Sequence, residues 1–251
     1  MAPNLLVLGG TTEATALCRA LAETGLNGTI SFAGRVARPV RQPLPQRVGG
    51  FGGVAGLCAY LRAQNITHVV DATHPFAAQM SRNAVAACAQ TGVPLVALSR
   101  APWMAEAGDH WSQVADMDGA VAALDRPAER VMLAIGRMHL AEFAPHPQHF
   151  YLLRLVDPPE IAPPLPDTHV VVDRGPFSMQ SDLALMRDHR ISLVVSKNSG
   201  GTGAYAKLLA ARAVGVPVIM IDRPTLPERC EVHSVQAVLD WIAHAPSDLG
   251  V

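Results

Sequence analysis

The chain has 251 residues, a length that suits one large domain or two of ordinary size. Hydrophobic residues make up 49% and charged residues 16%, a balance that excludes an intrinsically disordered chain. The net charge of −1, without a basic block, argues against nucleic acid as the main partner. We find neither an apolar run of the roughly 18 residues that a membrane span needs nor a signal peptide, and expect a soluble cytoplasmic protein.

The first hundred residues alternate between apolar β-type runs and helical patterns. Strands are predicted at 5–8, at 29–32, in a short piece ending at Val48, at 68–71 and at 94–98, and helices near 12–24, 54–64 and 76–91. The strands are almost continuously apolar, as expected for strands that are buried on both faces. Strands that alternate with helices indicate βαβ units and a parallel sheet.

The same pattern restarts after residues 100–111, which we interpret as a linker because they lack periodicity. Strands are predicted at 131–135, 150–155, 170–173, 193–196 and 218–221, and helices near 138–143, 179–188, 204–214 and 235–244. We therefore expect two parallel-sheet α/β domains, residues 1–106 and 107–251, flanking a cleft. Sheets of this class bind ligands beyond the carboxyl ends of their strands.

The motif "GGTTEA", which begins at Gly9, lies between the first strand and the first helix. Glycine lets backbone N–H groups approach a pyrophosphate, and a helix N-terminus favours anions. Thr11 and Thr12 can add hydroxyl donors. The motif is not GxGxxG, so a tight βα turn with threonine caps stays open as an alternative.

Two further features of the first domain suit an anionic cofactor. After the second strand, where an NAD site carries an acidic residue, the chain has "AGRVARPVR" with Arg35, Arg38 and Arg41. Arginine suits the 2′-phosphate of NADPH, although a solvated basic loop is the alternative. The run "GGFGG", residues 49–53, could bend around an anionic or flat ligand, or it could be a flexible turn.

The motif "DATHPFA" follows the strand that ends at Asp71. Asp71 and His74 are expected at the carboxyl edge of the sheet, beside the first glycine turn. His74 could donate a proton or pair with a carboxylate. A purely structural capping role is the alternative for both residues.

The second domain carries a comparable loop, "SKNSGGTGAYAK", from Ser196 to Lys207. Its glycines precede a helix, and Lys197 adds a cation to this second candidate anion site. "DRGPF" and "IGRMHL" place Arg174 and Arg137 after two other strands, where a surface ion pair is the alternative role. Several such loops suggest a ligand with several carboxylates or phosphates. The four cysteines show no CxxC pair, so we expect buried apolar residues and no metal site.

Taken together, these motifs resemble the precorrin-6A reductase family of cobalamin biosynthesis. The matching pieces are "VLGGTTEA", "AGR", "GGFGG", "DATHPFA", "RGPF", "SKNSGGTGAYAK" and "PVIMIDRP", in family order between residues 6 and 224. The resemblance implies two Rossmann-like domains and NADPH-dependent reduction of a macrocyclic double bond in precorrin-6A, giving precorrin-6B. The substrate is then a tetrapyrrole with several carboxylate arms.

Site residues follow from the motifs and the resemblance together. The residues expected to bind NADPH are Gly9, Gly10, Thr11, Thr12, Glu13, Arg35, Arg38, Gly50, Gly52 and Thr73. Those expected to bind substrate are Arg137, Arg174, Ser196, Lys197, Asn198, Ser199, Gly200, Gly201 and Tyr205. The candidate catalytic residues are Lys197, His74 and Asp71.

Two alternative functions stay open at this stage. One is an NADH-dependent reductase that acts on cobalt-precorrin-6A, and the other is a two-domain protein that binds a polyanionic ligand without redox chemistry. The proton donor and the oligomeric state do not follow from the sequence, which is compatible with a monomer.

Overall fold

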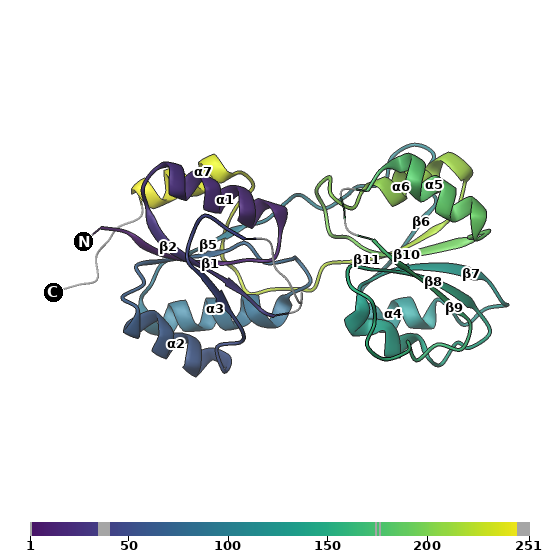
Figure 1. Cartoon of the computed structure of the whole chain (residues 1–251), viewed down its shortest axis with the longest axis horizontal. Helices are drawn as coiled ribbons and strands as arrows, with labels where there is room; N and C mark the ends of the chain where they lie inside the picture. The colour runs from purple at the N-terminus through teal and green to yellow at the C-terminus, as the bar shows by residue number, and fades with distance from the viewer. Residues whose placement is uncertain (1, 35–40, 174, 176, 245–251) are drawn as a thin grey trace. The chain divides into compact units, whose positions relative to one another are not determined.

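The computed structural model describes residues 2–34, 41–173, 175 and 177–244. The chain divides into two compact units, of which unit 1 comprises Met1–Arg100 and Thr225–Val251 and unit 2 comprises Ala101–Pro224. Each unit contains one six-stranded sheet with helices on its faces (Figure 1). The predicted class, two Rossmann-like α/β domains with parallel sheets, is confirmed.

The sheet of unit 1 has the strand order β12-β5-β4-β1-β2-β3. Its strands are β1 (Asn4–Leu8), β2 (Asn27–Phe32), β3 (Gln46–Val48), β4 (His68–Asp71), β5 (Leu95–Leu98) and β12 (Cys230–Val232), and all its pairs are parallel. The order reverses at β1, whose neighbours are β2 and β4.

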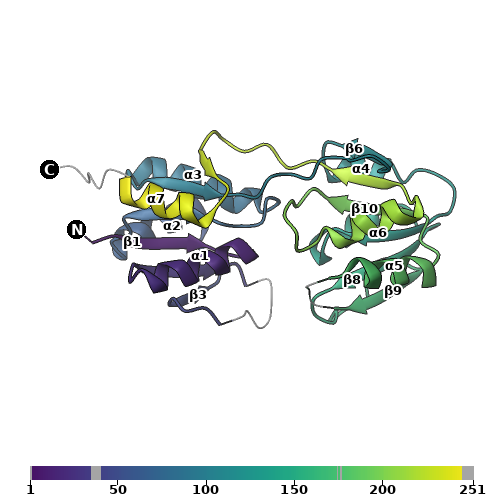
Figure 2. The ribbon, with the colours of Figure 1, turned by 90° about the horizontal axis from the view of Figure 1, so that it is seen from above.

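Helices cover both faces of this sheet because side chains alternate along each strand. Along β1, Leu5 and Val7 pack with α1 (Thr12–Glu23) and α7 (Val235–His244), whereas Leu6 and Leu8 pack with α2 (Gly53–Ala63) and α3 (Ala78–Thr91). The two views in Figures 1 and 2 show these two helical layers, with α1 beside α7 and α2 beside α3.

The sheet of unit 2 has the order β6-β11-β10-β7-β8-β9 and is also parallel throughout. Its strands are β6 (Trp111–Val114), β7 (Arg130–Ala134), β8 (Phe150–Leu155), β9 (Thr168–Val172), β10 (Leu193–Lys197) and β11 (Val218–Ile221). Its helices are α4 (Met117–Ala122), the 3₁₀ helix η1 (Arg137–Phe143), α5 (Met179–Asp188) and α6 (Ala206–Val214). The order reverses at β7, as it does at β1 in unit 1.

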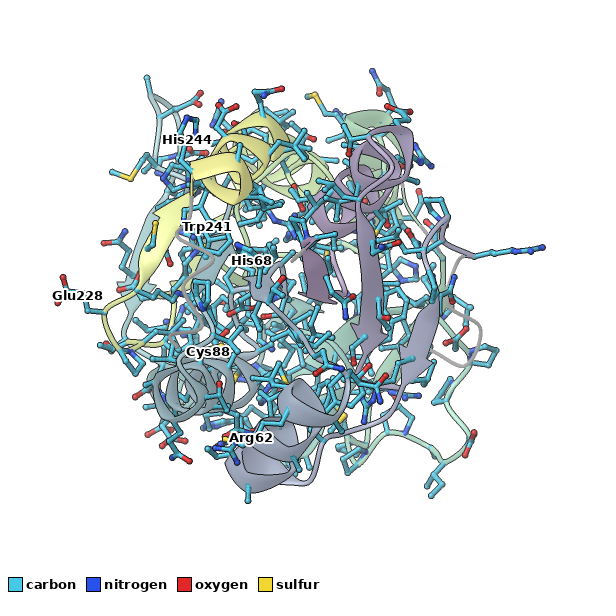
Figure 3. The ribbon with its side chains drawn as sticks, turned by 90° about the vertical axis from the view of Figure 1, so that its left-hand side faces the viewer. Arg62, His68, Cys88, Glu228, Trp241 and His244 are labelled. Carbon is cyan, nitrogen blue, oxygen red and sulfur yellow. The ribbon has the colours of Figure 1, made fainter. Side chains whose placement is uncertain are left out.

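The expected domain bounds, 1–106 and 107–251, are wrong for the last part of the chain. From Thr225 the chain returns to unit 1, where β12 pairs with β5 and α7 packs against α1. Trp241 of α7 also makes an edge-to-face contact with His68 of β4, at 5.4 Å between ring centroids (Figure 3). These pairings join residues far apart in sequence, and local patterns carry no sign of them.

Three short elements were not predicted: β6, α4 and β12. β6 has Ser112 and Gln113 at its centre and β12 has three residues, so neither shows the apolar run of a central strand. Both are edge strands of their sheets. None of the described helices has the length and apolar character that crossing a membrane requires.

Candidate functional site

The first glycine turn lies where the strand order of unit 1 reverses. It follows β1, and its neighbour at the same edge is the loop that follows β4. β1 leads to α1 on one face of the sheet, and β4 leads to α3 on the other. The two loops therefore diverge, which is the arrangement at which open α/β sheets bind ligands.

Gly9 and Gly10 are required for different reasons. The Gly9 N–H donates to the Ser31 carbonyl at 2.9 Å, and a Cβ on Gly9 would lie 2.8 Å from Cδ1 of Ile30. Packing against β2 thus requires glycine at residue 9. Gly10 has φ +136°, and a Cβ there would meet no atom within 4 Å. The turn therefore leaves open space beside the N-terminus of α1, which suits a phosphate.

Thr11 serves as the N-cap of α1. Its hydroxyl oxygen accepts from the Ala14 N–H at 3.1 Å, and the hydroxyl donates to the Ala72 carbonyl at 2.8 Å. The hydroxyl that we expected to serve a ligand is thus engaged within the protein, as the threonine-cap alternative requires. The same bond joins the turn after β1 to the turn after β4.

Thr12 and Glu13 begin α1. The Thr12 hydroxyl donates to Oε2 of Glu13 at 3.1 Å, and Glu13 forms an ion pair of 3.5 Å with Arg100. Arg100 thus partly balances a carboxylate that would otherwise disfavour an anion at this helix end.

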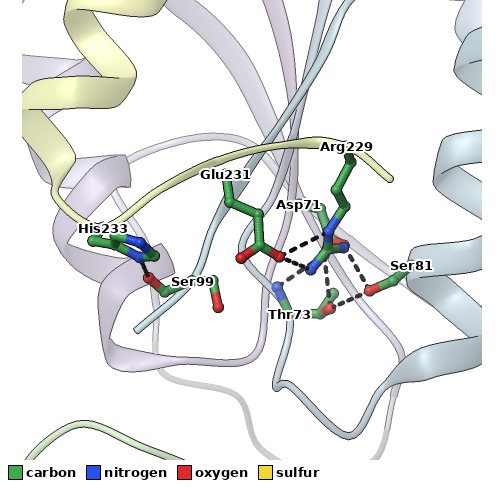
Figure 4. A network of polar contacts seen from close by, with 7 residues as sticks. All are labelled: Asp71, Thr73, Ser81, Ser99, Arg229, Glu231 and His233. Carbon is green, nitrogen blue, oxygen red and sulfur yellow. Dashed lines mark hydrogen bonds and ion pairs between the residues drawn. The ribbon is translucent and has the colours of Figure 1, made fainter. Parts of the chain in front are cut away.

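Asp71 is the last residue of β4 and accepts hydrogen bonds on both of its carboxylate oxygens (Figure 4). Its Oδ1 accepts from the backbone N–H of Thr73 at 3.1 Å and from the Thr73 hydroxyl at 2.7 Å. Its Oδ2 accepts from the Ser81 hydroxyl and from Nη1 of Arg229, each at 2.6 Å. We call Asp71, Thr73, Ser81 and Arg229 the Asp71 network. Arg229 also pairs with Glu231 at 2.9 Å.

His74 is half-buried in the loop between β4 and α3. Its Nδ1 accepts from the backbone N–H of Phe76 at 3.2 Å. A neutral imidazole in this arrangement carries its proton on Nε2. The contact with Phe76 is compatible with both roles that the sequence left open for His74, structural capping and proton transfer.

The glycine run before α2 needs glycine at several positions. The φ angles of Gly49, Gly52 and Gly53 are +118°, +81° and +79°, and Gly52 is the N-cap residue of α2. A Cβ on Gly50 would meet nothing within 4 Å. The expected positions Gly50 and Gly52 thus belong to an open loop at the carboxyl edge of β3.

Arg47, which sequence reasoning missed, shapes this loop. Its guanidinium donates to the carbonyls of Gly49 and Gly50, each at 2.6 Å, and to the Ser31 hydroxyl at 3.0 Å. It also lies over the Phe51 ring, with Cζ 3.8 Å from the centroid. The only sequence signal for this role is an arginine two residues before the glycine run.

Three predicted arginines, Arg35, Arg38 and Arg174, lie outside the described residues. Arg41 lies within the described residues, and it is exposed to solvent. Arg137 begins η1 and is exposed, directly after Gly136 with φ +80°.

In unit 2, the end of β10 is deeply buried. Ser196, Lys197 and Asn198 are 0%, 8% and 4% exposed. The Asn198 side chain pairs with the backbone of Trp103, accepting from its N–H at 2.8 Å and donating to its carbonyl at 3.0 Å. Asn198, expected to bind substrate, thus fixes the segment that leads into β6.

Ser199 follows, and its hydroxyl and backbone N–H donate to the Lys197 carbonyl at 3.4 and 2.8 Å.

The glycines after Ser199 are also packed within unit 2. Gly200 and Gly201 have φ +68° and +69°, and a Cβ on Gly200 would collide with the Ala101 carbonyl and the Arg223 guanidinium. Nε1 of Trp103 donates to the Gly201 carbonyl at 2.7 Å. Glycine at residue 200 is therefore explained by packing.

Tyr205 is engaged with the same entering segment. Its hydroxyl donates to Glu106 at 3.2 Å and accepts from Arg212 at 3.0 Å. Arg212 also pairs with Glu106 and Asp109, each at 2.9 Å. The expected substrate contact at Tyr205 thus has a structural alternative.

A buried charged cluster under this loop was also missed. Arg154 of β8 and Asp182 of α5 form an ion pair, and the Asp182 side chain is fully buried. Nζ of Lys207 donates to the Ala204 carbonyl at 2.7 Å and lies 4.8 Å from the Trp103 ring centroid. Burial, and secondarily the charge of Arg154, lower the pKa of Lys207 to about 7, although Asp182 opposes the shift. No local pattern distinguishes such a lysine from a surface one.

The cysteines do not form a reactive centre. Cys18, Cys58 and Cys88 are buried and Cys230 is exposed. Burial raises the pKa of the Cys18 thiol to about 11. Burial is also the main cause that raises the pKa of the Cys88 thiol, to about 12. Both side chains therefore remain thiols at neutral pH. Within the described part of the chain, no group of three or more His, Cys, Asp or Glu residues could hold a metal ion.

Comparison with known proteins identifies relatives over nearly the whole chain. The family model described as "Precorrin-6x reductase CbiJ/CobK" matches residues 4–243. The chain is 58% identical to a precorrin-6A reductase of Rhodobacter capsulatus, with 99% of each covered, and 46% identical to one of a Sinorhizobium species, with 96% and 93% covered. It is 26% identical to a cobalt-precorrin-6A reductase of Priestia megaterium, with 96% and 97% covered. A solved structure described as "CobK precorrin-6A reductase" matches with TM-score 0.93 at 58% identity, covering 99% of this chain and 100% of that one.

The buried position of Lys207 predicts a pH-dependent contribution to stability. Its ordinary pKa is 10.5 and its pKa in the folded chain is about 7. Between these values the unfolded chain binds a proton that the folded chain lacks, so the free energy of unfolding should rise with pH. Lys207→Met removes this contribution. Urea unfolding at pH 7, 8 and 9 should show wild type gaining stability relative to Lys207→Met, whereas a constant difference would contradict the burial argument.

Proposed function

Because the chain belongs to the precorrin-6x reductase family, we propose that it reduces one double bond of the precorrin-6A macrocycle with NADPH, giving precorrin-6B in cobalamin biosynthesis. The two precorrin-6A reductases compared above are 58% and 46% identical to the chain, whereas the cobalt-precorrin-6A reductase of Priestia megaterium is 26% identical. This difference favours the metal-free substrate over the cobalt-containing alternative.

The open turn at Gly10 is the observation that carries the proposal of a dinucleotide site. It lies at the reversal of strand order in unit 1, has a φ of +136° and is followed at once by a helix of twelve residues. Backbone N–H groups at such a helix start suit a pyrophosphate. The residues present therefore fit a nicotinamide dinucleotide.

The preference for NADPH over NADH rests on the charges after β2. Between Phe32 and Phe51 the sequence has no Asp or Glu but four arginines, Arg35, Arg38, Arg41 and Arg47. An NAD site needs a carboxylate there for the ribose hydroxyls, whereas arginine suits a 2′-phosphate. Because Arg47 already donates to the glycine loop, we assign the binding of the 2′-phosphate of NADPH to Arg35 and Arg38.

The reaction needs a hydride and a proton on adjacent carbons of the macrocycle. A bound nicotinamide supplies the hydride, and the chain has to orient the ring and deliver the proton. Asp71 is a poor proton donor because its carboxylate already accepts four hydrogen bonds. We therefore keep His74 and Lys197 as candidate donors, and we favour for Lys197 the binding of a substrate carboxylate.

Replacement of Gly10 tests the cofactor site. Gly10→Val places a β-branched side chain in the open space of the turn and should abolish NADPH binding, measured by NADPH fluorescence. Gly92→Val is the matched control, because Gly92 also has a positive φ, +72°, and nothing within 4 Å of its Cβ position. Both variants should lose some stability, but only the control should bind NADPH. Normal binding by folded Gly10→Val would refute the site.

Replacement of Lys197 separates substrate binding from chemistry. If Lys197 holds a carboxylate, Lys197→Ala should raise the KM for precorrin-6A and keep most of kcat, because that interaction is shared by ground and transition states. A proton donor would instead show a fall in kcat of roughly 10²–10⁴-fold. NADPH affinity should not change in either case. Wild-type values for both steady-state constants would exclude both roles.

A further inference from the structure

We propose that Arg229 is a positioning residue for NADPH binding, acting by neutralising Asp71 and thereby fixing the turn beside the N-terminus of α1. This inference rests on the proposed dinucleotide site at Gly10. Arg229 lies in the segment that brings the chain back to unit 1, just before β12, and its side chain is only 9% exposed. It is far in sequence from every motif that we assign to the cofactor.

Both carboxylate oxygens of Asp71 are engaged by hydrogen-bond donors of the protein. All four of its contacts come from donors, two on each carboxylate oxygen, and they fill the acceptor sites of the group. The side chain is 2% exposed, so water contributes little to its solvation. Among the described residues, the cation that pairs with the Asp71 carboxylate is the guanidinium of Arg229 (Figure 4). A buried carboxylate that lost this partner would be an uncompensated charge.

Ala72, the residue after Asp71, is hydrogen-bonded through its backbone to the candidate cofactor turn. Asp71 pairs with Leu8 across β4 and β1, and the next residue, Ala72, donates its N–H to the Leu8 carbonyl at 2.9 Å. The Ala72 carbonyl accepts from the Thr11 hydroxyl, whose oxygen caps Ala14 at the start of α1. Fixing the turn after Asp71 therefore also fixes the N-cap of α1.

Charge gives Arg229 a second effect on the same site. Asp71 ends β4 opposite the last residue of β1, directly before Gly9 and Gly10. An unbalanced carboxylate here would repel a pyrophosphate, and screening between buried groups is weak. Arg229 removes this repulsion without occupying the open space at Gly10.

A double-variant cycle separates charge balance from simple packing. Arg229→Met should weaken NADPH binding about tenfold or more, because a buried negative charge is left unpaired. Arg229→Lys keeps the charge and should stay near wild type. In the double variant Asp71→Asn with Arg229→Met, the unpaired charge is gone, and the Kd for NADPH should return to within about threefold of wild type. At saturating NADPH, Arg229→Met should keep the kcat of wild type, because Arg229 acts on cofactor binding and not on the reacting atoms.

Arg82→Met is the matched control. Arg82 lies beside Ser81 in α3 and also donates to the returning segment, at the Thr225 carbonyl 2.9 Å away. The ion-pair partner of Asp71 among the described residues is Arg229 and not Arg82. NADPH affinity should be unchanged in this variant. A similar loss of NADPH affinity in Arg82→Met would show that any hydrogen bond from an arginine to this segment has the same effect. That result would overturn the specific role of Arg229.

The remaining outcomes also decide the question. An unchanged Kd in Arg229→Met, or a double variant that binds as weakly as the single one, would overturn the inference. If Arg229→Met does not fold but the double variant folds and binds NADPH, charge balance is supported; if neither folds, Arg229 has only a structural role. Failure of wild type to bind NADPH, or normal binding by Gly10→Val, would instead refute the dinucleotide site itself.

Discussion

Parallel pairing between β1 and β4 is the constraint on which the candidate cofactor site depends. It brings the ends of both strands to one edge, so that Gly10 and the turn after Asp71 are neighbours although about sixty residues separate them. The bond from the Thr11 hydroxyl to the Ala72 carbonyl then joins the two turns. In the function that we propose, an anion would occupy the open space at Gly10, and these contacts would hold the surroundings of that space in place.

The two units have the same strand order, and in each sheet the edge strand next to β5 or β11 is formed by a segment that enters from the other unit. The chain leaves β5 in unit 1 to form β6 in unit 2, and it leaves β11 in unit 2 to form β12 in unit 1. Each entering segment also holds the end of the fourth strand of its new sheet. Trp103 pairs with Asn198 after β10, and Arg229 pairs with Asp71 at the end of β4. One structural solution is thus used twice, once with an amide and once with an ion pair.

Most central strands and the glycine turns were predictable from the sequence, because continuous apolar runs and glycine positions are local signals. The assignment of residues 225–251 was wrong because strand pairing between β12 and β5 leaves no local trace. The same reason hid Arg229, which contacts a residue 158 positions away. Lys207 shows a related limit, since burial and a pKa near 7 arise from neighbours on other elements. For Thr11 the sequence allowed both a ligand contact and a cap, and its hydrogen bonds support the cap.

Hydride transfer from NADPH to precorrin-6A is the step that the proposed function requires. It is tested most directly with NADPH that carries deuterium at C4 of the nicotinamide, on one face and then on the other, followed by mass spectrometry of the product. We expect one deuterium in each product molecule from one of the two labelled cofactors and none from the other, because a folded site presents a single face. Product without deuterium from either cofactor, or no turnover with NADPH, would contradict the account.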